Sequence, residues 1–551
     1  MGEHALAVNS RKLSAETLDR LIKLGGISSS SGLSRSRTNE LCTTIEELGR
    51  CAEMLAAASL LRFACHDNSK VAHAAAVAIH ALLSDVNPLD LVFLDLHVRT
   101  FGPWDSTRSS EGQFRPEDLQ RLVASQQDCE LTLGLASFHR DGFVREAATR
   151  ALAKSTSGIE LPFLLIRAND WIEPVREVAA QALRERAEAE YAPHMVRNLP
   201  LILRLREVGR RDHELLVQAL EDIVVSQAAF GELRAAFVGS DRHLRRAAID
   251  VAVARRKVSL CLNALASADA MVRLRSARFL FAERPPIEGC SLADELAADG
   301  FSALRREALR YAVEHCPDSL RQRLTAAMCD RSLAVRHAGN YHARSKLGLD
   351  SATFYRQALR PESRPGPLYD ITASIAGLGE NGDAGDASML RSFVEHVLPR
   401  VQRAALQAIA ALDFDSNEDV FFTALASSQP GVSRKARELL LKVPLRGEQP
   451  AIERSMLDSA YAHVRSNALR VLAGTGKWSG LRYILLALQR DDSPLNDLAV
   501  RFISRWIHDH NRRFIQPQAD DVPRIESLLE AVRRKLPKGQ HRTLVAIVQS
   551  F

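Results

Sequence analysis

Aromatic residues are scarce in this sequence. They make up 6% of its 551 residues, with 7 Tyr and 4 Trp, whereas hydrophobic residues as a whole reach 46%. Strands favour aromatic and β-branched side chains, while the Ala, Leu and Arg that are abundant here favour helices. The composition therefore argues against a β protein and favours closely packed helices.

Long apolar runs and a cysteine framework are also missing. No apolar stretch reaches the roughly 18 residues that span a bilayer, and the N-terminus lacks the apolar segment of a secretory signal. The sequence therefore predicts a cytoplasmic protein without a membrane span. The cysteines show no C-x-x-C spacing, so we interpret them as buried free thiols in a reducing cytosol; they are Cys42, Cys51, Cys65, Cys129, Cys261, Cys290, Cys316 and Cys329.

Motifs for catalysis and for cofactor or metal binding are absent too. There is no phosphate-binding loop, nucleophile elbow or kinase signature, and Gly379 and Gly382 follow no predicted strand. The spacing of the one cluster of possible metal ligands matches no known zinc motif, so we interpret it as a helix surface; it consists of Cys65, His66, Asp67, His73 and His80. We predict no catalytic, cofactor-binding or metal-binding residue, and no enzyme.

What the sequence does contain is a recurring phrase: an Asp, a few residues, Val or Leu followed by Arg, and then a helix rich in small residues. The apolar position advances from 144 to 175, from 244 to 274, 304 and 335, and from 401 to 432 and 464, in steps of 30–32 residues. Such a period is the signature of a repeat array, in which each unit packs on its neighbours. The Asp and Arg of successive copies are Asp141 and Arg145, Asp170 and Arg176, Asp241 and Arg245, Asp269 and Arg275, Asp299 and Arg305, Asp330 and Arg336, and Asp458 and Arg465.

Each part of the phrase has a physical role in a helix. The Asp precedes the first turn, where its carboxylate can accept hydrogen bonds from free backbone N–H groups. Val or Leu, with Ala three and four residues later, forms one apolar stripe at helical spacing. A second amphipathic segment, such as 161–166 or 481–488, lies between successive phrases. Two helices per repeat predict the antiparallel hairpins of an α-solenoid.

One stretch resembles a known family. Leu378-Gly379-Glu-Asn-Gly382-Asp383 is similar to the L-G-x-x-G-D turn of the HEAT-like repeats first named for phycobiliprotein lyases, and Leu472-Ala-Gly474-Thr-Gly476 looks like a second copy. The resemblance covers about residues 60–510 and implies an all-α, right-handed α-solenoid of HEAT-like helical hairpins with repeats of about 31 residues. Gln402 and Ser433 depart from the pattern, because they stand where other copies have Arg. The same repeat serves scaffolds, lyases and DNA-repair glycosylases, so it does not select a function.

Breaks in the pattern suggest three regions. We expect an N-terminal helix and a flexible Ser/Gly-rich tether in 1–40, the solenoid in 41–510 and capping helices in 511–551. An insertion at 96–117 interrupts the array, and a stiffer one follows at 360–369. Long insertions within a compact array are often functional, but a disordered surface insertion is the simpler interpretation of 96–117.

The recurring Asp and Arg have two interpretations. The arginines could bind phosphate, but a fixed Asp and a fixed Arg in every repeat favour a ladder of ion pairs between repeats. Asp170, followed by Trp171, could suggest a glycosylase carboxylate near a flipped base. It occupies the ordinary Asp position of its repeat, however, so the structural interpretation is preferred.

The strongest candidate for partner binding is a basic block at 241–280. The net charge of the whole chain is +6, and this block alone, with nine Lys/Arg and three Asp, also carries +6. On a concave face it would attract an acidic partner or a nucleic-acid backbone, although a solvated ridge is the simpler interpretation. We select Arg242, Arg246, Arg255, Arg256 and Lys257 from this block, and Arg99 and Trp104 from the 96–117 insertion, as candidate partner-binding residues.

Function is predicted only in outline. A non-catalytic scaffold or adaptor that holds a protein or peptide is the first hypothesis, because a repeat array without a chemical motif presents surface and little else. The alternative is a nucleic-acid-binding HEAT-like protein, conceivably of DNA-repair type, that uses the basic block. A lyase or a chaperone for a prosthetic group is third and rests on resemblance alone.

Overall fold

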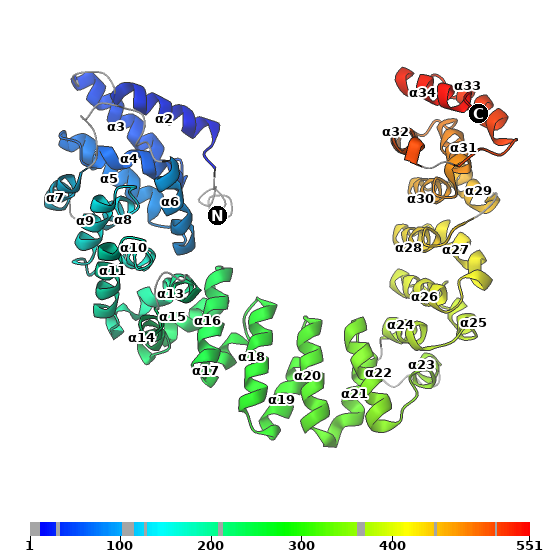
Figure 1. Ribbon diagram of the computed structural model, residues 1–551. Helices are drawn as coiled ribbons and strands as arrows, with labels where there is room; N and C mark the ends of the chain where they lie inside the picture. The colour runs from blue at the N-terminus through cyan, green and yellow to red at the C-terminus, as the bar shows by residue number, and fades with distance from the viewer. Residues whose placement is uncertain are drawn as a thin grey trace. The chain divides into compact units, whose positions relative to one another are not determined.

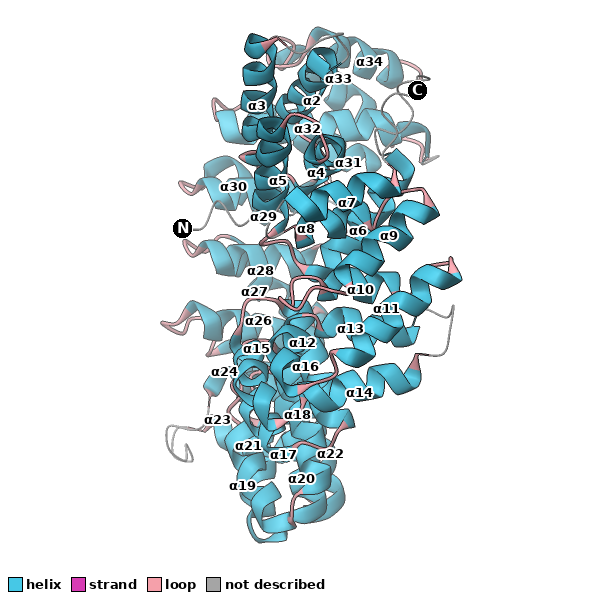
Figure 2. Ribbon diagram, turned by 90° about the vertical axis from the view of Figure 1, so that its left-hand side faces the viewer, coloured by secondary structure: helices cyan, strands magenta, loops and turns pink. Residues whose placement is uncertain are grey.

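The computed structural model describes residues 12–28, 34–101, 115–125, 129–207, 213–360, 370–445, 449–512 and 515–551. Throughout these residues the chain is built from α-helices, a few 3₁₀ turns and loops, without a strand (Figures 1 and 2). It divides into two compact units, Met1–Pro285 and Pro286–Phe551. None of the described helices is long and apolar enough to cross a membrane.

The helices of the first unit are α2 (Ala15–Ser28), α3 (Arg35–Gly49), α4 (Ala57–Ala64), α5 (Ser69–Leu83), α6 (Pro88–Phe101), α7 (Pro116–Ser125), α8 (Glu130–Ala136), α9 (Gly142–Leu152), α10 (Leu161–Arg167), α11 (Glu173–Glu185), α12 (Ala192–Arg197), α13 (Leu199–Glu207), α14 (Glu214–Val224), α15 (Phe230–Val238), α16 (Arg242–Ala254), α17 (Val258–Ala264) and α18 (Ala270–Glu283).

The helices of the second unit are α19 (Pro286–Leu296), α20 (Ser302–His315), α21 (Leu320–Met328), α22 (Leu333–Leu347), α23 (Ser351–Leu359), α24 (Ile371–Asn381), α25 (Asp386–Arg391), α26 (Pro399–Leu412), α27 (Glu418–Leu425), α28 (Pro430–Leu440), α29 (Pro450–Asp458), α30 (Ala462–Leu472), α31 (Lys477–Leu488), α32 (Ser493–Asp509), α33 (Asp521–Ala531) and α34 (Lys538–Val548).

The helices pack as the repeat predicts. In the second unit each helix pair, such as α27 with α28 or α29 with α30, forms a hairpin, and the second helices α26, α28 and α30 pack in a row. Apolar residues of the recurring phrase, such as Val401, Val432 and Val464, are buried between the layers. The prediction of an all-α solenoid of helical hairpins is confirmed.

The predicted caps form at the start of the second helices. The carboxylate of Asp141 accepts a hydrogen bond from the backbone N–H of Phe143 at 2.9 Å, and that of Asp269 accepts one from Met271 at 2.9 Å. Each bond satisfies a backbone donor that the first turn of a helix leaves without a partner.

The recurring arginine makes two kinds of contact, which together we call the interlock. Arg305 Nη1 donates to the carbonyl of Asp299, six residues earlier, at 2.7 Å. Its Nε and Nη2 donate to both oxygens of Asp330, the recurring Asp of the next repeat, at 2.7 and 2.6 Å. The interlock therefore joins the loop of one repeat to the loop of the next.

The interlock recurs along the chain. The bond to the carbonyl six residues earlier is made by Arg145, Arg176, Arg245, Arg273, Arg305, Arg336 and Arg465. Arg145, Arg305 and Arg465 also pair with the Asp that precedes the next second helix, so these three make both contacts; the partners are Asp170, Asp330 and Asp492. The predicted ladder of ion pairs between repeats is present, and its guanidiniums are largely buried.

Where the sequence departs from Arg, a neutral group keeps part of the interlock. Gln402 Nε2 donates to the His396 carbonyl at 2.7 Å, again six residues earlier. Ser433 Oγ donates to the Leu425 carbonyl and accepts a hydrogen bond from Asn467 Nδ2 at 2.9 Å. These copies keep polar contacts between helices without a buried charge.

Two assignments within the phrase were wrong. In the repeat of α18 the interlocking arginine is Arg273, whereas Arg275 pairs with Asp250 at the surface. Asp458 ends α29, and Ser459 Oγ accepts the N–H of Tyr461 in the position where other repeats use Asp. Both errors follow from shifts of one or two residues in loops, which the sequence period does not resolve.

The limits of the insertions also differ from the prediction. Residues 96–101 are the last turns of α6 and residues 116 and 117 begin α7, while 102–114 lie outside the described residues. The second insertion falls almost entirely on 361–369, which also lie outside them. At the N-terminus α3 begins at Arg35, within the predicted tether, and packs against α2 and α5.

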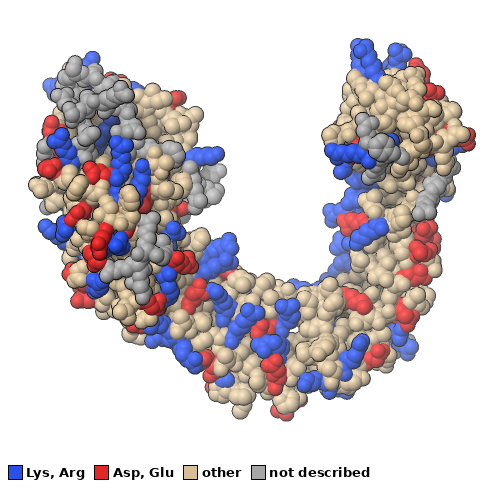
Figure 3. Space-filling view, in the orientation of Figure 1, with Lys and Arg blue, Asp and Glu red and all other residues tan. Residues whose placement is uncertain are grey.

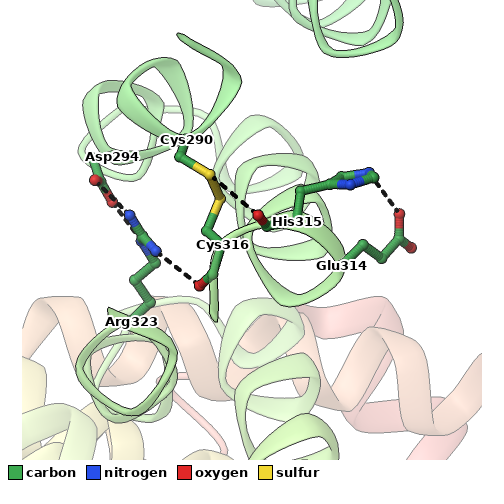
Figure 4. The surroundings of a disulfide bond; sticks show 6 residues. All are labelled: Cys290, Asp294, Glu314, His315, Cys316 and Arg323. Carbon is green, nitrogen blue, oxygen red and sulfur yellow. Dashed lines mark hydrogen bonds and ion pairs between the residues drawn. A yellow bond between two sulfur atoms is a disulfide. The ribbon is translucent and has the colours of Figure 1, made fainter. Parts of the chain in front are cut away.

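The interpretation of all eight cysteines as free thiols was wrong for two of them. Cys290 of α19 and Cys316, which follows α20, form a disulfide (Figure 4). Beside it, Arg323 of α21 donates to both oxygens of Asp294 at 2.7 and 2.8 Å and to the Cys316 carbonyl. Cys261 and Cys329 are buried as predicted, and burial raises their pKa to about 12 and about 11, so both stay protonated near neutral pH.

The interlock generates a prediction about stability. Arg305→Ala should lower the free energy of unfolding by about 3 kcal/mol, because Asp330 would lose a largely buried partner. The neighbouring exposed residue provides a control: Arg306→Ala should cost less than about 0.5 kcal/mol. Urea unfolding followed by circular dichroism measures both, and equal losses would contradict the interlock.

The disulfide generates a second prediction. It closes a loop with a sequence separation of 26, so Cys290→Ser should lower the free energy of unfolding by about 3 kcal/mol without reductant. With dithiothreitol present, the wild type and the variant should unfold alike. A variant that matches the wild type without reductant would contradict a disulfide that stabilises α19 against α20.

Candidate functional site

The basic block at 241–280 spans α16, α17 and α18. Its start is fixed by Asp241, whose carboxylate caps α16 through the N–H groups of His243 and Leu244 and also accepts a hydrogen bond from Asn87 at 2.7 Å. Arg242 is the first residue of α16 and Lys257 precedes α17, and both side chains are exposed.

The other three candidate residues in the block are ion-paired. Arg246 Nε bonds Asp269 at 3.0 Å, and Arg256 Nη2 bonds Glu283 at 2.6 Å. Arg255 pairs with Glu221 at 3.2 Å and with Asp222 at 3.1 Å.

These partners change the charge of the block. Glu221, Asp222 and Glu283 lie outside 241–280, so counting charge within that window overstates the exposed positive charge. Arg242 and Lys257 are the two candidates that no carboxylate is seen to neutralise among the described residues. The block is largely a set of ion pairs between helices, some of them at the surface, to which Arg242 and Lys257 add two exposed cations.

Arg99 and Trp104 are not brought together by the described structure. Trp104 lies outside the described residues. Arg99 is on α6, where its Nε donates to Asp95 at 2.9 Å and its Nη2 to Asp170 at 3.2 Å.

Arg99 belongs to a buried network of three guanidiniums and two carboxylates. Asp170, 2% exposed, accepts hydrogen bonds from Arg145 at 3.0 and 3.2 Å and from Arg167 at 2.8 Å. Arg167 also pairs with Asp95 at 2.7 Å. One arginine from each of α6, α9 and α10 therefore donates to the carboxylate of Asp170.

The electrostatics of this network exclude one function. Burial alone would raise the pKa of Asp170, but the guanidiniums of Arg167 and Arg145 outweigh it and hold that pKa below its usual value. Burial lowers the pKa of Arg167, which lies beside Arg99 as well as beside the carboxylates. A carboxylate enclosed in this way cannot reach a flipped base, so Asp170 has a structural role.

A cavity of about 350 Å³ lies beside the network, between α6, α10 and α13. Arg99, Arg167 and the exposed Arg204 line it together with Asp95, and apolar side chains such as Leu96 and Leu201 form the rest of the wall. The sequence did signal the buried members, because Asp95 and Arg167 are isolated charges within apolar helical runs. An isolated charge in such a run needs a buried partner, and this need is the signal that could have located the network.

The predicted absence of a metal site can be compared with the structure only in part. Among the described residues, no group of three or more His, Cys, Asp or Glu side chains could hold a metal ion. His73 and His80 lie on α5, as expected for a helix.

Comparisons with known proteins give a fold-level likeness. No family model matches the sequence, and the search of curated proteins finds no match. Among solved structures, one describing Kap95p binding to RanGDP is similar at a TM-score of 0.41 and 12% identity, over 99% of this chain and 79% of the other. A structure of importin β in an ammonium sulfate condition is similar at a TM-score of 0.27 and 12% identity, over 99% of this chain and 83% of the other.

Kap121p bound to RanGTP is similar at a TM-score of 0.30 and 14% identity, over 94% of this chain and 58% of the other. This chain thus spans little more than half the length of that protein. At such identities and TM-scores we transfer no residue role and no partner from these proteins.

The buried network predicts a dependence of stability on pH. Because the pKa of Asp170 is lowered on folding, its contribution is complete above the unfolded pKa of about 3.9 and is lost as pH falls through the lower folded value. Asp170→Asn should therefore be less stable than the wild type by about 3 kcal/mol at pH 7. The difference should shrink only below about pH 4.

Urea unfolding at a series of pH values measures this difference, and each protein is compared with the wild type at the same pH. Arg150→Ala, which removes an exposed ion pair from the neighbouring α9, is the control and should show no such change. A difference that disappears already at pH 6 would contradict the assignment to Asp170.

Proposed function

We propose that this chain is a non-catalytic scaffold or adaptor that binds a protein or peptide partner on the surface of its helical repeats. The observation that carries the proposal is the interlock. At Arg145, Arg305 and Arg465 it joins the recurring Arg of one repeat to the Asp of the next, and it fixes these helix pairs against their neighbours. A stiff row of helices then presents the exposed side chains that vary between repeats, which is how repeat arrays select partners.

The resemblance of 378–383 to the turn of HEAT-like repeats supports the same proposal, because that repeat commonly serves as a binding surface. The sequence predicts a cytoplasmic location, and the Cys290–Cys316 disulfide argues against it, because disulfides are rare in a reducing compartment and persist in an oxidising one.

The alternative function, binding of nucleic acid through 241–280, is less favoured. Affinity for a phosphate backbone depends on the number of cations that are available to it. Arg246, Arg255 and Arg256 are each engaged with a carboxylate of the chain. Arg242 and Lys257 are therefore the residues that distinguish the two functions.

The test uses the full chain and the double variant Arg242→Glu with Lys257→Glu. Both residues are exposed, so the double variant should fold like the wild type. We expect affinity purification from the native host to recover a protein in fixed stoichiometry with the wild type. In fluorescence anisotropy, we expect single-stranded and duplex DNA and RNA to show no binding even at about 50 mM salt.

Nucleic-acid binding that weakens steeply with salt and is lost in the double variant would overturn the proposal in favour of the alternative. Recovery of no stoichiometric protein would also contradict it. Arg234→Glu, a change of an exposed arginine on α15, serves as the control for charge reversal.

A further inference from the structure

Charge is segregated between the two helix layers of the second unit. The second helices α26, α28 and α30 carry seven Lys or Arg and one Glu, a net charge of +6. The first helices α25, α27 and α29 carry two Arg and five acidic residues, a net charge of −3. In the right-hand part of Figure 3, Lys and Arg accordingly gather on the side of α26, α28 and α30, and Asp and Glu on the other.

A cavity of about 610 Å³ lies at one end of the basic layer, between α28, α30, α31 and α32. Four basic side chains line it, against one carboxylate, that of Asp509. The basic residues are Arg437, Arg470, Lys477 and Arg505. The lining therefore has an excess of three positive charges, which is unlike the network at Asp170, where carboxylates and guanidiniums nearly balance.

Two of these cations are partly or largely buried. Lys477 is 8% exposed, and its Nζ lies 5.2 Å from the ring centroid of Trp478 and 6.0 Å from that of Trp506. Arg470 donates to the Ser466 carbonyl at 2.9 Å. Burial lowers the pKa of both, and for Arg470 the neighbouring Arg437 and Arg501 lower it further. An anion in the cavity would relieve this crowding of positive charge.

The turn beside the cavity is the second copy of the glycine-containing turn, with its charge reversed. In the first copy Asp383 follows Gly382, and its carboxylate pairs with Arg356 at 2.7 Å. In the second copy Lys477 follows Gly476 at the corresponding place and begins α31. In the first copy, the charge of Asp383 is neutralised by Arg356. In the second copy, the ammonium group of Lys477 and the N-terminus of α31 lie at the cavity.

The rest of the cavity wall is apolar. Phe502 and Trp506 of α32 and Ile484 of α31 line it, and Trp506 is held by a hydrogen bond from its Nε1 to the Lys477 carbonyl at 2.8 Å. His510 also lines the cavity, and its Nδ1 is buried without a hydrogen-bond partner in the described structure. Such a wall suits an acidic residue that has an apolar residue beside it in the bound segment.

We propose that this cavity receives an acidic side chain from an extended, acidic segment of a partner protein, and that further acidic residues of the segment lie along α26 and α28. This inference rests on the proposed scaffold function and adds the chemistry of the partner. Exposed Arg400 and Arg434 extend the positive surface along those helices. The aromatic side chains Phe502 and Trp506 lie in the cavity wall, but α26, α28 and α30 contain no Phe, Tyr or Trp on which a run of successive bases could stack, which favours a peptide over single-stranded nucleic acid.

The test measures binding of a fluorescein-labelled peptide of about twelve residues, in which Glu alternates with Leu around a central Phe. The full chain is titrated into it at about 50 mM and about 500 mM salt. We expect saturable binding that weakens at the higher salt. A peptide with Gln in place of every Glu should bind at least about ten-fold more weakly.

Two variants locate the site. Arg505 is on the surface and its side chain is 80% exposed, so Arg505→Glu should fold normally and weaken peptide binding several-fold. Arg470→Gln together with Arg505→Glu should weaken it by about ten-fold or more. The control is Arg454→Glu, which makes the same charge reversal at an exposed residue of α29 in the acidic layer. It should leave peptide binding unchanged.

Three outcomes would overturn the inference: no binding of the Glu peptide, equal weakening by Arg454→Glu, or single-stranded DNA that binds more tightly than the peptide and responds to the same variants. If the natural partner still binds the Arg470→Gln, Arg505→Glu variant with unchanged affinity, the scaffold function stands and this site fails. If no protein partner is recovered, the scaffold function itself fails.

Discussion

The interlock between a buried arginine and an aspartate of the next repeat is the constraint on which the array depends. Two neighbouring helix pairs share an apolar interface, and apolar packing alone tolerates sliding and small rotations. The guanidinium of Arg305 or Arg145 adds fixed directions, because its three nitrogens satisfy a carbonyl on one side and a bidentate carboxylate on the other. Burying such a pair contributes little net stability, but it disfavours every other stacking in which a charge would be left without a partner.

This constraint also decides where function can lie. Most charged residues of the recurring phrase are engaged within the chain, and the pairs of Arg246, Arg255 and Arg256 extend the same arrangement through the basic block. A high density of arginine in one part of the sequence therefore does not make a binding surface there. The basic layer of α26, α28 and α30 was less conspicuous in the sequence, because acidic residues of the alternate helices dilute it in any continuous window.

The sequence predicted those features that depend on local spacing. The period, the capping role of Asp141 and Asp269, and the partnership of Asp and Arg follow from helical geometry and from the need to satisfy buried charge. The sequence also showed that Gln402 replaces the recurring Arg, but it did not show that Gln402 still donates to the His396 carbonyl.

Features that depend on which helices meet were not predicted. The network of Asp95, Arg99 and Arg167 joins residues more than seventy positions apart, and the cavity beside Lys477 is formed by four helices. The disulfide joins cysteines whose spacing matches no motif, so only the packing of α19 on α20 brings them together. A shift of two residues moved the arginine that contacts the loop carbonyl from Arg275 to Arg273, which the period could not detect.

A double-mutant cycle on Arg305 and Asp330 tests the interlock most directly. The free energies of unfolding of Arg305→Ala, of Asp330→Ala and of the double variant are compared with that of the wild type. If the interaction between Arg305 and Asp330 stabilises the junction between their repeats, the coupling energy should be about 2 kcal/mol or more. A coupling energy near zero would show that the repeats stack by apolar packing alone and would contradict a structural role for the interlock.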